Sequence, residues 1–259
     1  MFHNKTKEKL QNGEPVLGVI INGNYPQLVE IVGLLGFDYI FIDMEHSTMS
    51  FPDMENCIRA AELPGMDSIV RVSNHDPQGI LKTLDAGAKG LIVPHVNTRE
   101  QAEAIVRAAK FAPLGDRGLG SSRYQEYGMG KKRQELFDEC NAETLVIPIM
   151  ESAEALRNAE EIMAVPGADG FSVGTSDLAM DMGLANDTGH PDVIAAQDKL
   201  AELAKKYGKF TGGPIRSDAD YETLIGKGIN FLLINIHSFI RNEGKRCLSL
   251  FNAAKENHR

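Results

Sequence analysis

The sequence lacks an excess of basic residues and lacks any long apolar run. Lys and Arg number 27 against 36 Asp and Glu, which gives a formal net charge of −9. A nucleic-acid-binding protein usually carries a basic face, so this balance argues against one. No stretch approaches the roughly 20 apolar residues that span a membrane, and the polar start MFHNKTKEKLQNGEP has no apolar signal segment. We therefore expect neither a nucleic-acid partner nor a membrane partner.

Cysteine is scarce and unpaired in the sequence. Cys57, Cys140 and Cys247 are far apart, odd in number and not arranged as CxxC. This pattern disfavours a disulfide framework and a structural zinc site, and it is typical of reduced thiols. We therefore expect a cytoplasmic protein.

Several nucleotide-binding and catalytic motifs are also missing. No GxGxxG or P-loop pattern follows any apolar run, which disfavours a dinucleotide or nucleoside triphosphate site. Neither the GxSxG of serine hydrolases nor the HExxH of zinc proteases occurs. The chemistry must therefore come from residues that are scattered along the chain.

Short apolar runs alternate with helical segments from one end of the chain to the other. Near-continuous apolar runs are typical of parallel strands that are covered on both faces. The predicted strands are 15–22, 39–44, 67–72, 90–96, 144–151, 168–174, 209–215 and 230–236. Helical spacing of apolar residues predicts helices at 26–35, 53–63, 77–85, 98–110, 152–164 and 218–227. Thr98 is the expected N-cap of its helix, with Gln101 in the capping-box position.

This alternation predicts an α/β fold, a single (β/α)8 barrel over residues 1–259. An open, doubly wound sheet is the alternative, and the missing GxGxxG disfavours it. The long connections 111–132 and 181–190 are expected to follow strands and to grip the substrate. Apolar positions in 238–256 predict a final helix, which packs either on its own barrel or on a neighbouring subunit.

Two carboxylates follow neighbouring strands of this barrel. Glu151 ends one strand and Asp177 follows the next, so the two would lie about 5 Å apart. Carboxylates that close repel each other unless a cation lies between them. Two protein oxygens with open positions for water and substrate suit Mg²⁺ or Mn²⁺. The alternative is that Asp177 caps a helix and Glu151 merely ends a strand.

A histidine with acidic neighbours follows the second strand, in FIDMEHS. An imidazole such as that of His46 can act as a general base near neutral pH. Asp43 and Glu45 could orient it or hold metal-bound water. The alternative is that the carboxylates cap a turn and His46 is simply solvated.

Arg71 interrupts the apolar run SIVRV. A buried guanidinium is costly without a partner, so Arg71 should face either an anionic ligand or a structural carboxylate. The turn formed by Gly174, Thr175, Ser176 and Asp177 presents backbone N–H groups that can hold an anion. A Schiff-base aldolase is disfavoured, because Lys89 and Lys209 lie before their strands, at the wrong end of a barrel.

Taken together, these phrases resemble the HpcH/HpaI family of metal-dependent pyruvate aldolases. The resemblance runs from about Pro15 to at least His237 and rests on phrases that occur in the family's order. They are GFDYIFIDMEHS, IVRVSNHDPQGILKTLDAGAKGLIVPHV, KFAPLGDRGLGSS, MES, VPGADGFSVGTSDLAMDMG and GHPDV.

The resemblance implies a barrel of the phosphoenolpyruvate/pyruvate-domain type and an aldolase that joins or cleaves pyruvate and an aldehyde. It implies that Glu151 and Asp177 bind Mg²⁺, Mn²⁺ or Co²⁺. His46 would be the proton acceptor, with Asp85 raising its basicity, and Arg71 would stabilise the transition state. Asp43 and Glu45 would support these residues.

The resemblance further assigns substrate binding and assembly. The turn at Gly174, Ser176 and Asp177 would hold the pyruvate carboxylate, together with Arg71. Relatives assemble as hexamers with C-terminal helices packed across subunits, so a homo-oligomer is expected.

One departure from the family pattern concerns the substrate. Family members commonly have Gln two residues before the metal-binding Glu, where it contacts the keto acid, and this chain has Ile149. Thr175 and Ser176 also replace a frequent Pro-Ala pair. Related reactions therefore stay open: malyl-CoA or citryl-type lysis, enolate decarboxylation, or a catalytically silent barrel that binds a metabolite.

Overall fold

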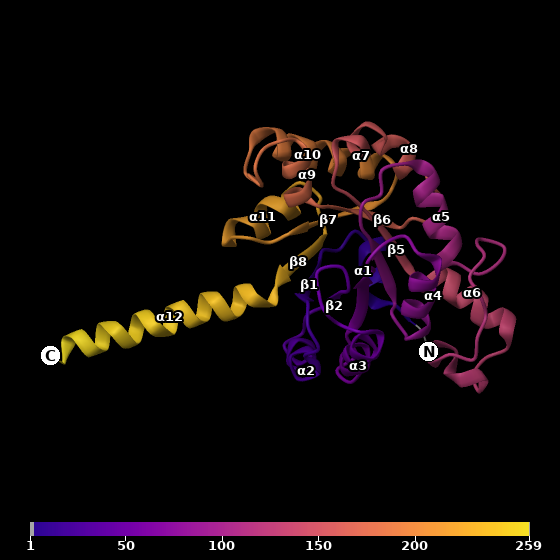
Figure 1. The fold of residues 1–259 in the computed structure, drawn as a ribbon, viewed down its shortest axis with the longest axis horizontal. Coiled ribbons are helices and arrows are strands. Elements are labelled where there is room, and N and C mark those ends of the chain that lie inside the picture. Colours follow the sequence, from indigo (N-terminus) through magenta and orange to yellow (C-terminus); the bar gives the residue numbers. More distant parts are fainter. Residues whose placement is uncertain (1–2, 259) are drawn as a thin grey trace.

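The computed structural model describes residues 3–258, so residues 1, 2 and 259 of the predicted domain lie outside the described residues. Eight parallel strands close into a barrel in chain order, with helices around it (Figure 1). The strands are β1 (Val16–Ile21), β2 (Tyr39–Asp43), β3 (Asp67–Arg71), β4 (Gly90–Val93), β5 (Leu145–Met150), β6 (Gly170–Val173), β7 (Phe210–Pro214) and β8 (Phe231–Asn235). The predicted (β/α)8 barrel is confirmed, and the open-sheet alternative is excluded.

The helices include every one that the sequence predicts, and α1, η1, α6, α9 and α10 in addition. They are α1 (Lys5–Gln11), α2 (Pro26–Leu34), α3 (Phe51–Glu62), α4 (Pro77–Asp85), α5 (Arg99–Ala109), the 3₁₀ helix η1 (Arg123–Gly128), α6 (Arg133–Glu143), α7 (Ala153–Arg157), α8 (Ala159–Met163), α9 (Thr175–Asp181), α10 (Pro191–Lys206), α11 (Asp218–Gly226) and α12 (Ile236–Asn257). The predicted capping box of Thr98 and Gln101 is present at α5. The predicted helix 152–164 is two short helices that meet at Asn158, whose backbone is not helical.

Strand side chains pack on both faces of the barrel wall. Phe41, Ile69 and Ile147 belong to a cluster that fills the barrel interior. Ile40 and Ile42 point the other way, into the cluster formed with α2 and α3. This two-sided burial explains the near-continuous apolar runs, and it leaves charged residues only at the strand ends.

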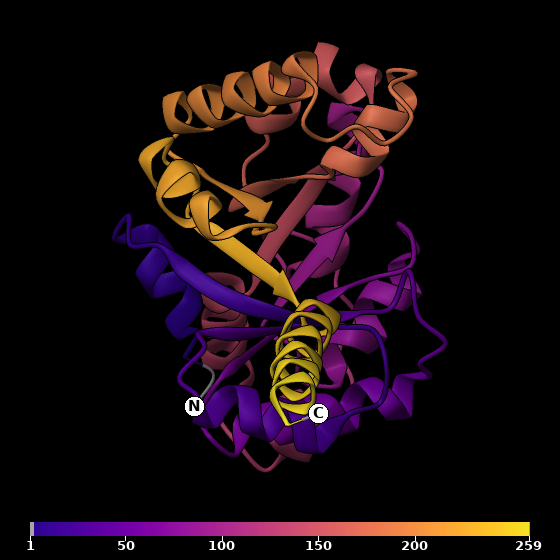
Figure 2. The same cartoon turned by 90° about the vertical axis from the view of Figure 1, so that its left-hand side faces the viewer.

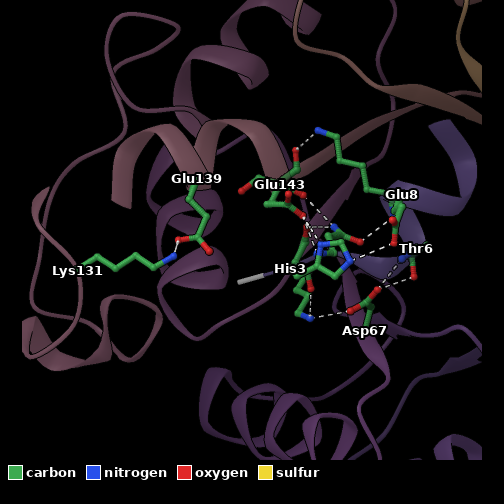
Figure 3. A network of polar contacts seen from close by, with 11 residues as sticks. His3, Thr6, Glu8, Asp67, Lys131, Glu139 and Glu143 are labelled. Carbon is green, nitrogen blue, oxygen red and sulfur yellow. Dashed lines mark hydrogen bonds and ion pairs between the residues drawn. The ribbon is translucent and has the colours of Figure 1, made fainter. Parts of the chain in front are cut away.

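Helix α1 closes the N-terminal end of the barrel through polar contacts (Figure 3). Thr6 donates to Asp67 from its backbone N–H at 2.7 Å and from its hydroxyl at 2.9 Å. Lys89 pairs with the same carboxylate at 2.7 Å. The backbone N–H of Asn4 donates to Glu143 at 2.7 Å. Because these partners begin or precede strands, the network ties the strand beginnings together.

The connection 111–132 lies at this same N-terminal end. It follows α5 and leads through η1 into α6, so it joins a helix to the next strand. The prediction that it follows a strand and grips the substrate is therefore wrong for a single chain. Helix α5 carries the chain back along the barrel before the connection starts. The connection 181–190, in contrast, lies between β6 and α10 as predicted.

Helix α12 extends away from the barrel (Figures 1 and 2). Only its first residue, Ile236, is buried among the described residues of the helix. Ile240 is 61% exposed, and Leu248 and Phe251 are each 64% exposed. The apolar stripe predicted here touches its own barrel through Phe239, whose ring centroid lies 6.0 Å from that of Phe37, while the residues beyond it are exposed. Within residues 3–258, no helix is both long enough and apolar enough to cross a membrane.

Candidate active site

Charged side chains gather at the C-terminal ends of β2 and β3. The strand register places Asp43 directly beside Arg71. Arg71 donates from Nε to Asp43 Oδ1 at 2.9 Å and from Nη2 to Oδ2 at 2.6 Å. Its Nη1 also lies 3.0 Å from Glu45 Oε2. The bidentate pair with Asp43 and the third contact fix the plane of the guanidinium.

Arg71 keeps its charge despite its burial. Burial alone would lower the pKa of Arg71, but the hydrogen bond and charge of Asp43, with the charges of Glu45 and Glu151, outweigh it and raise the pKa. The sequence predicts that Arg71 faces either an anionic ligand or a structural carboxylate, and in the structure it pairs with the carboxylate of Asp43. A guanidinium has five N–H donors, and the hydrogen bonds to Asp43 use two of them, while Nη1 also forms an ion pair with Glu45, so donors remain for a ligand.

His46 is held by its backbone more than by its ring. Asp43 Oδ1 accepts from the backbone N–H groups of Glu45 at 3.0 Å and of His46 at 3.2 Å. The His46 ring is 64% exposed, and its Nε2 lies 3.7 Å from Glu45 Oε2. Asp43 therefore shapes the turn that carries His46, and the ring stays free to reach a substrate.

His95 links Glu45 to Glu151, and the sequence analysis does not single it out. It follows β4 in a left-handed conformation with a φ of 55°. Its Nε2 lies 3.2 Å from Glu45 Oε1, and its Nδ1 lies 3.0 Å from Glu151 Oε1. The one signal in the sequence is a histidine just after a strand, in IVPHV, as at His46. Contacts now run without a break from Asp43 through Arg71, Glu45 and His95 to Glu151.

Glu151 is the buried carboxylate of this set, with a side chain that is 3% exposed. Burial raises the pKa of the Glu151 carboxyl, and the charges of Asp177 and Glu45 raise it further, while the N–H and charge of His95 partly offset them. Gly174 makes room for this carboxylate, because a Cβ there would lie 2.3 Å from Glu151 Oε2. The predicted anion-binding turn therefore begins at a position that must be glycine, because a side chain there would collide with Glu151.

Asp177 lies on the adjacent turn and is exposed. It is the third residue of α9, whose N-cap is Gly174, and no side chain caps this helix. The capping alternative for Asp177 is therefore wrong. Ser176, its exposed neighbour, shares the turn. Arg216, beyond β7, donates to the Thr175 hydroxyl, and burial lowers the pKa of Arg216 with a partial offset from Asp220.

Asp85 does not join this cluster within one chain. It ends α4, on the side where β4 begins, whereas His46 follows the far end of β2. Its Oδ1 accepts from Arg117 Nη2 at 2.9 Å. Arg117 is enclosed between the rings of Phe111 and Tyr124, at 4.7 and 4.8 Å from their centroids. One copy of the chain therefore places Asp85 and His46 at opposite ends of the barrel.

The residues present fit a hard divalent cation. No group of three or more His, Cys, Asp or Glu side chains within 3–258 is arranged to hold a metal. The pair Glu151 and Asp177 offers two carboxylates, which is the protein donor set that Mg²⁺ takes when water and substrate supply the rest. The raised pKa of Glu151 reflects buried negative charge that a cation would offset.

Nearly the whole chain is similar to known aldolases and to a citrate synthase. A 4-hydroxy-2-oxovalerate aldolase of Novosphingobium aromaticivorans is 34% identical over 242 residues, which are 93% of this chain and 91% of the relative. A hydroxypyruvate/pyruvate aldolase of Rhizorhabdus wittichii is 34% identical over 233 residues, 88% of this chain and 90% of the relative. The crystal structure of the citrate synthase SbnG is 27% identical with a TM-score of 0.88, and covers 96% of this chain and 98% of that one.

The family profile described as HpcH/HpaI aldolase/citrate lyase matches residues 17–232. The predicted resemblance, and with it the predicted class of aldolase-type carbon–carbon lyases, is confirmed. The strands that carry Asp43, Arg71 and Glu151 all lie inside the matched residues. This chain belongs to the HpcH/HpaI aldolase/citrate lyase family.

Proposed function

We propose that this protein is a divalent-metal-dependent aldolase that forms or cleaves the bond between pyruvate, or a similar 2-oxo acid, and an aldehyde. The observation that carries the proposal is the unbroken set of contacts from Asp43 to Glu151. It lies at the C-terminal ends of four consecutive strands, where (β/α)8 enzymes hold their active sites. The aldolases among its relatives support the choice of substrates.

Glu151 and Asp177 would hold the cation, with Mg²⁺, Mn²⁺ or Co²⁺ as candidates. When bound, such an ion supplies Lewis-acid stabilisation of the charge that develops on the 2-oxo acid. Glu151 is suited to this role because it is buried and has a raised pKa, so its negative charge lacks compensation. The backbone N–H groups at Ser176 and Asp177 would orient the substrate carboxylate, as the family resemblance implies.

Arg71 and His46 would act on the reacting atoms. The N–H groups of Arg71 that do not bond Asp43 can stabilise the enolate oxygen, and the fixed plane of the guanidinium means that little reorganisation is needed. The exposed His46 ring would carry the proton between the substrate and water. Asp43 and Glu45 would keep both side chains in place.

Asp85 can assist His46 only from a second copy of the chain, because one copy separates the two residues along the barrel. We propose a homo-oligomer, a hexamer by resemblance. The exposed apolar stripe of α12, with Ile240, Leu248 and Phe251, would pack on a neighbouring subunit. We keep a cytoplasmic location in the proposal because Cys57 and Cys140 are buried free thiols.

Citryl-type chemistry on the same site is the second candidate. Ile149 is 4% exposed and belongs to the apolar cluster of the barrel interior, so it offers no polar contact to a keto acid. The similarity to the citrate synthase SbnG favours this alternative over the decarboxylase and the silent barrel.

Exchange of the pyruvate C3 protons in deuterated water tests the proposal without knowledge of the aldehyde. The full chain is depleted of metal and assayed by proton NMR with and without Mn²⁺. Exchange that requires Mn²⁺ supports the aldolase. Absence of exchange, together with cleavage of citrate or a citryl thioester, would replace the aldolase with the second candidate.

A further inference from the structure

His95 holds one oxygen of Glu151 with two separate groups. Its backbone N–H donates to Glu151 Oε1 at 2.7 Å. Its ring Nδ1 lies 3.0 Å from the same oxygen. A carboxylate oxygen with two such partners has a fixed position, and the rotation of the whole carboxylate is fixed with it.

The other oxygen of Glu151 faces a different neighbour. Oε2 points toward Gly174, where an added Cβ would lie only 2.3 Å away. The two oxygens of the Glu151 carboxylate therefore face different neighbours: Oε1 contacts His95, and Oε2 faces Gly174, which begins the turn that carries Asp177. An ion between Glu151 and Asp177 would meet Oε2 rather than both oxygens.

The backbone of His95 is itself held in an unusual conformation. Its φ of 55° lies in the left-handed region, which costs about 1–2 kcal/mol for a residue other than Gly, Asn or Asp. This conformation lets the N–H and the ring of one residue reach the same oxygen. The far side of the ring is fixed as well, because Nε2 lies 3.2 Å from Glu45 Oε1.

We propose that His95 is a positioning residue for the metal site: it holds Oε1 of Glu151, so that Glu151 binds the cation through Oε2 alone. The inference rests on the proposed function, because it assumes that Glu151 is a metal ligand. His95 also couples this ligand to Glu45 and Arg71, so the cation site and the arginine that faces the substrate keep a fixed relation.

The test measures Mn²⁺ affinity, which is independent of turnover. Metal-depleted full-length protein is titrated with Mn²⁺, and free Mn²⁺ is followed by electron paramagnetic resonance. We expect H95A to weaken Mn²⁺ binding by about 10- to 100-fold, the usual effect of removing a group that orients a metal ligand. H95N is the conservative variant, because Asn tolerates left-handed backbone and its side-chain amide can take the place of the ring beside Oε1. We expect it to stay within about threefold of wild type, since it keeps the orienting contact.

His46→Ala is the matched control, because His46 shares the mouth of the barrel and contacts Glu45 but not Glu151. Its Mn²⁺ affinity should equal that of wild type. H95A keeps the backbone N–H of residue 95 and removes only the ring. If H95A binds Mn²⁺ as wild type does, the ring of His95 does not position Glu151 and the inference fails, while the metal site itself stands. If the wild type binds no Mn²⁺, the proposed function fails together with the inference. Thermal unfolding of each metal-free variant shows whether a lost affinity reflects a lost fold.

Discussion

The two ends of the barrel carry polar networks that differ in charge balance: the N-terminal charges are paired, whereas the C-terminal end has an excess of carboxylates. At the N-terminal end, Asp67 receives Thr6 and Lys89, and Lys7 pairs with Asp169 at 2.8 Å. At the C-terminal end, carboxylates outnumber the arginines that contact them: Asp43 and Glu45 share Arg71, and Glu151 meets His95. Both networks tie neighbouring strands together.

The difference in balance separates a structural network from a functional one. Buried charges that are paired contribute little beyond holding their elements in place. Buried carboxylates without full compensation cost stability, and they persist where a ligand completes them. We therefore expect changes at the C-terminal end to affect activity, and changes at the N-terminal end to affect stability.

Glu151→Gln should have the largest effect. It removes one of two proposed metal ligands, and a loss of several kcal/mol of metal stabilisation corresponds to at least about a thousandfold in rate. Metal-dependent exchange of pyruvate protons measures this loss. Thermal stability should not fall, because the substitution removes a buried charge next to Glu45 and Asp177. If Glu151→Gln is fully active, Glu151 is not a ligand of the catalytic metal.

Lys89→Met should produce the converse result. Asp67 is fully buried, and removing one partner of a buried pair costs about 3–5 kcal/mol. We expect a lower midpoint of urea unfolding and an unchanged kcat of the folded protein. Thr6→Val provides a milder version, since Asp67 keeps Lys89 and the backbone N–H of Thr6. A loss of activity in folded Lys89→Met would contradict the separation of the two ends.

Arg71→Lys tests whether geometry or charge matters at the C-terminal end. Lysine keeps the positive charge but cannot form the bidentate pair with Asp43 and also reach a ligand. We expect the exchange rate to fall about a hundredfold, as when a preorganised donor is removed. Mn²⁺ affinity should change little, and an equal loss of both would show that Arg71 supports the metal site instead.

The pH dependence of stability should show the smallest effect. Glu151 has a raised pKa in the folded chain, so the folded state binds more protons than the unfolded state between the ordinary and raised values. The free energy of unfolding of metal-free protein should therefore decrease as pH rises through that interval. Glu151→Gln should remove this decrease, whereas Glu14→Gln, at an exposed position, should keep it. Urea unfolding across the pH range measures both slopes, and equal slopes in the two variants would contradict the raised pKa.

Much of this arrangement follows from local sequence patterns. The apolar runs predict all eight strands, and the strand ends then place Asp43, Arg71 and Glu151 at one mouth. His95 escapes prediction because it falls inside the predicted strand 90–96, whereas β4 ends at Val93 and the left-handed backbone of His95 is not specified by the apolar pattern. The connection 111–132 follows the predicted helix 98–110, which already puts it at the N-terminal end of the barrel, so the expectation that it follows a strand is wrong. Helix α6 is not predicted because Cys140 is its one buried residue. Asp85 cannot be assigned from one chain, since its partner there is Arg117.

Helix α1 has a consequence for the timing of synthesis. Its residues leave the ribosome before those of the barrel strands, yet the backbone N–H of Asn4 donates to Glu143, which lies 139 residues later in the chain. At about 5–20 residues per second, roughly 7–28 s pass before this partner exists. The helix that closes the barrel is thus made before its partner, and this contact can form only after Glu143 has been synthesised.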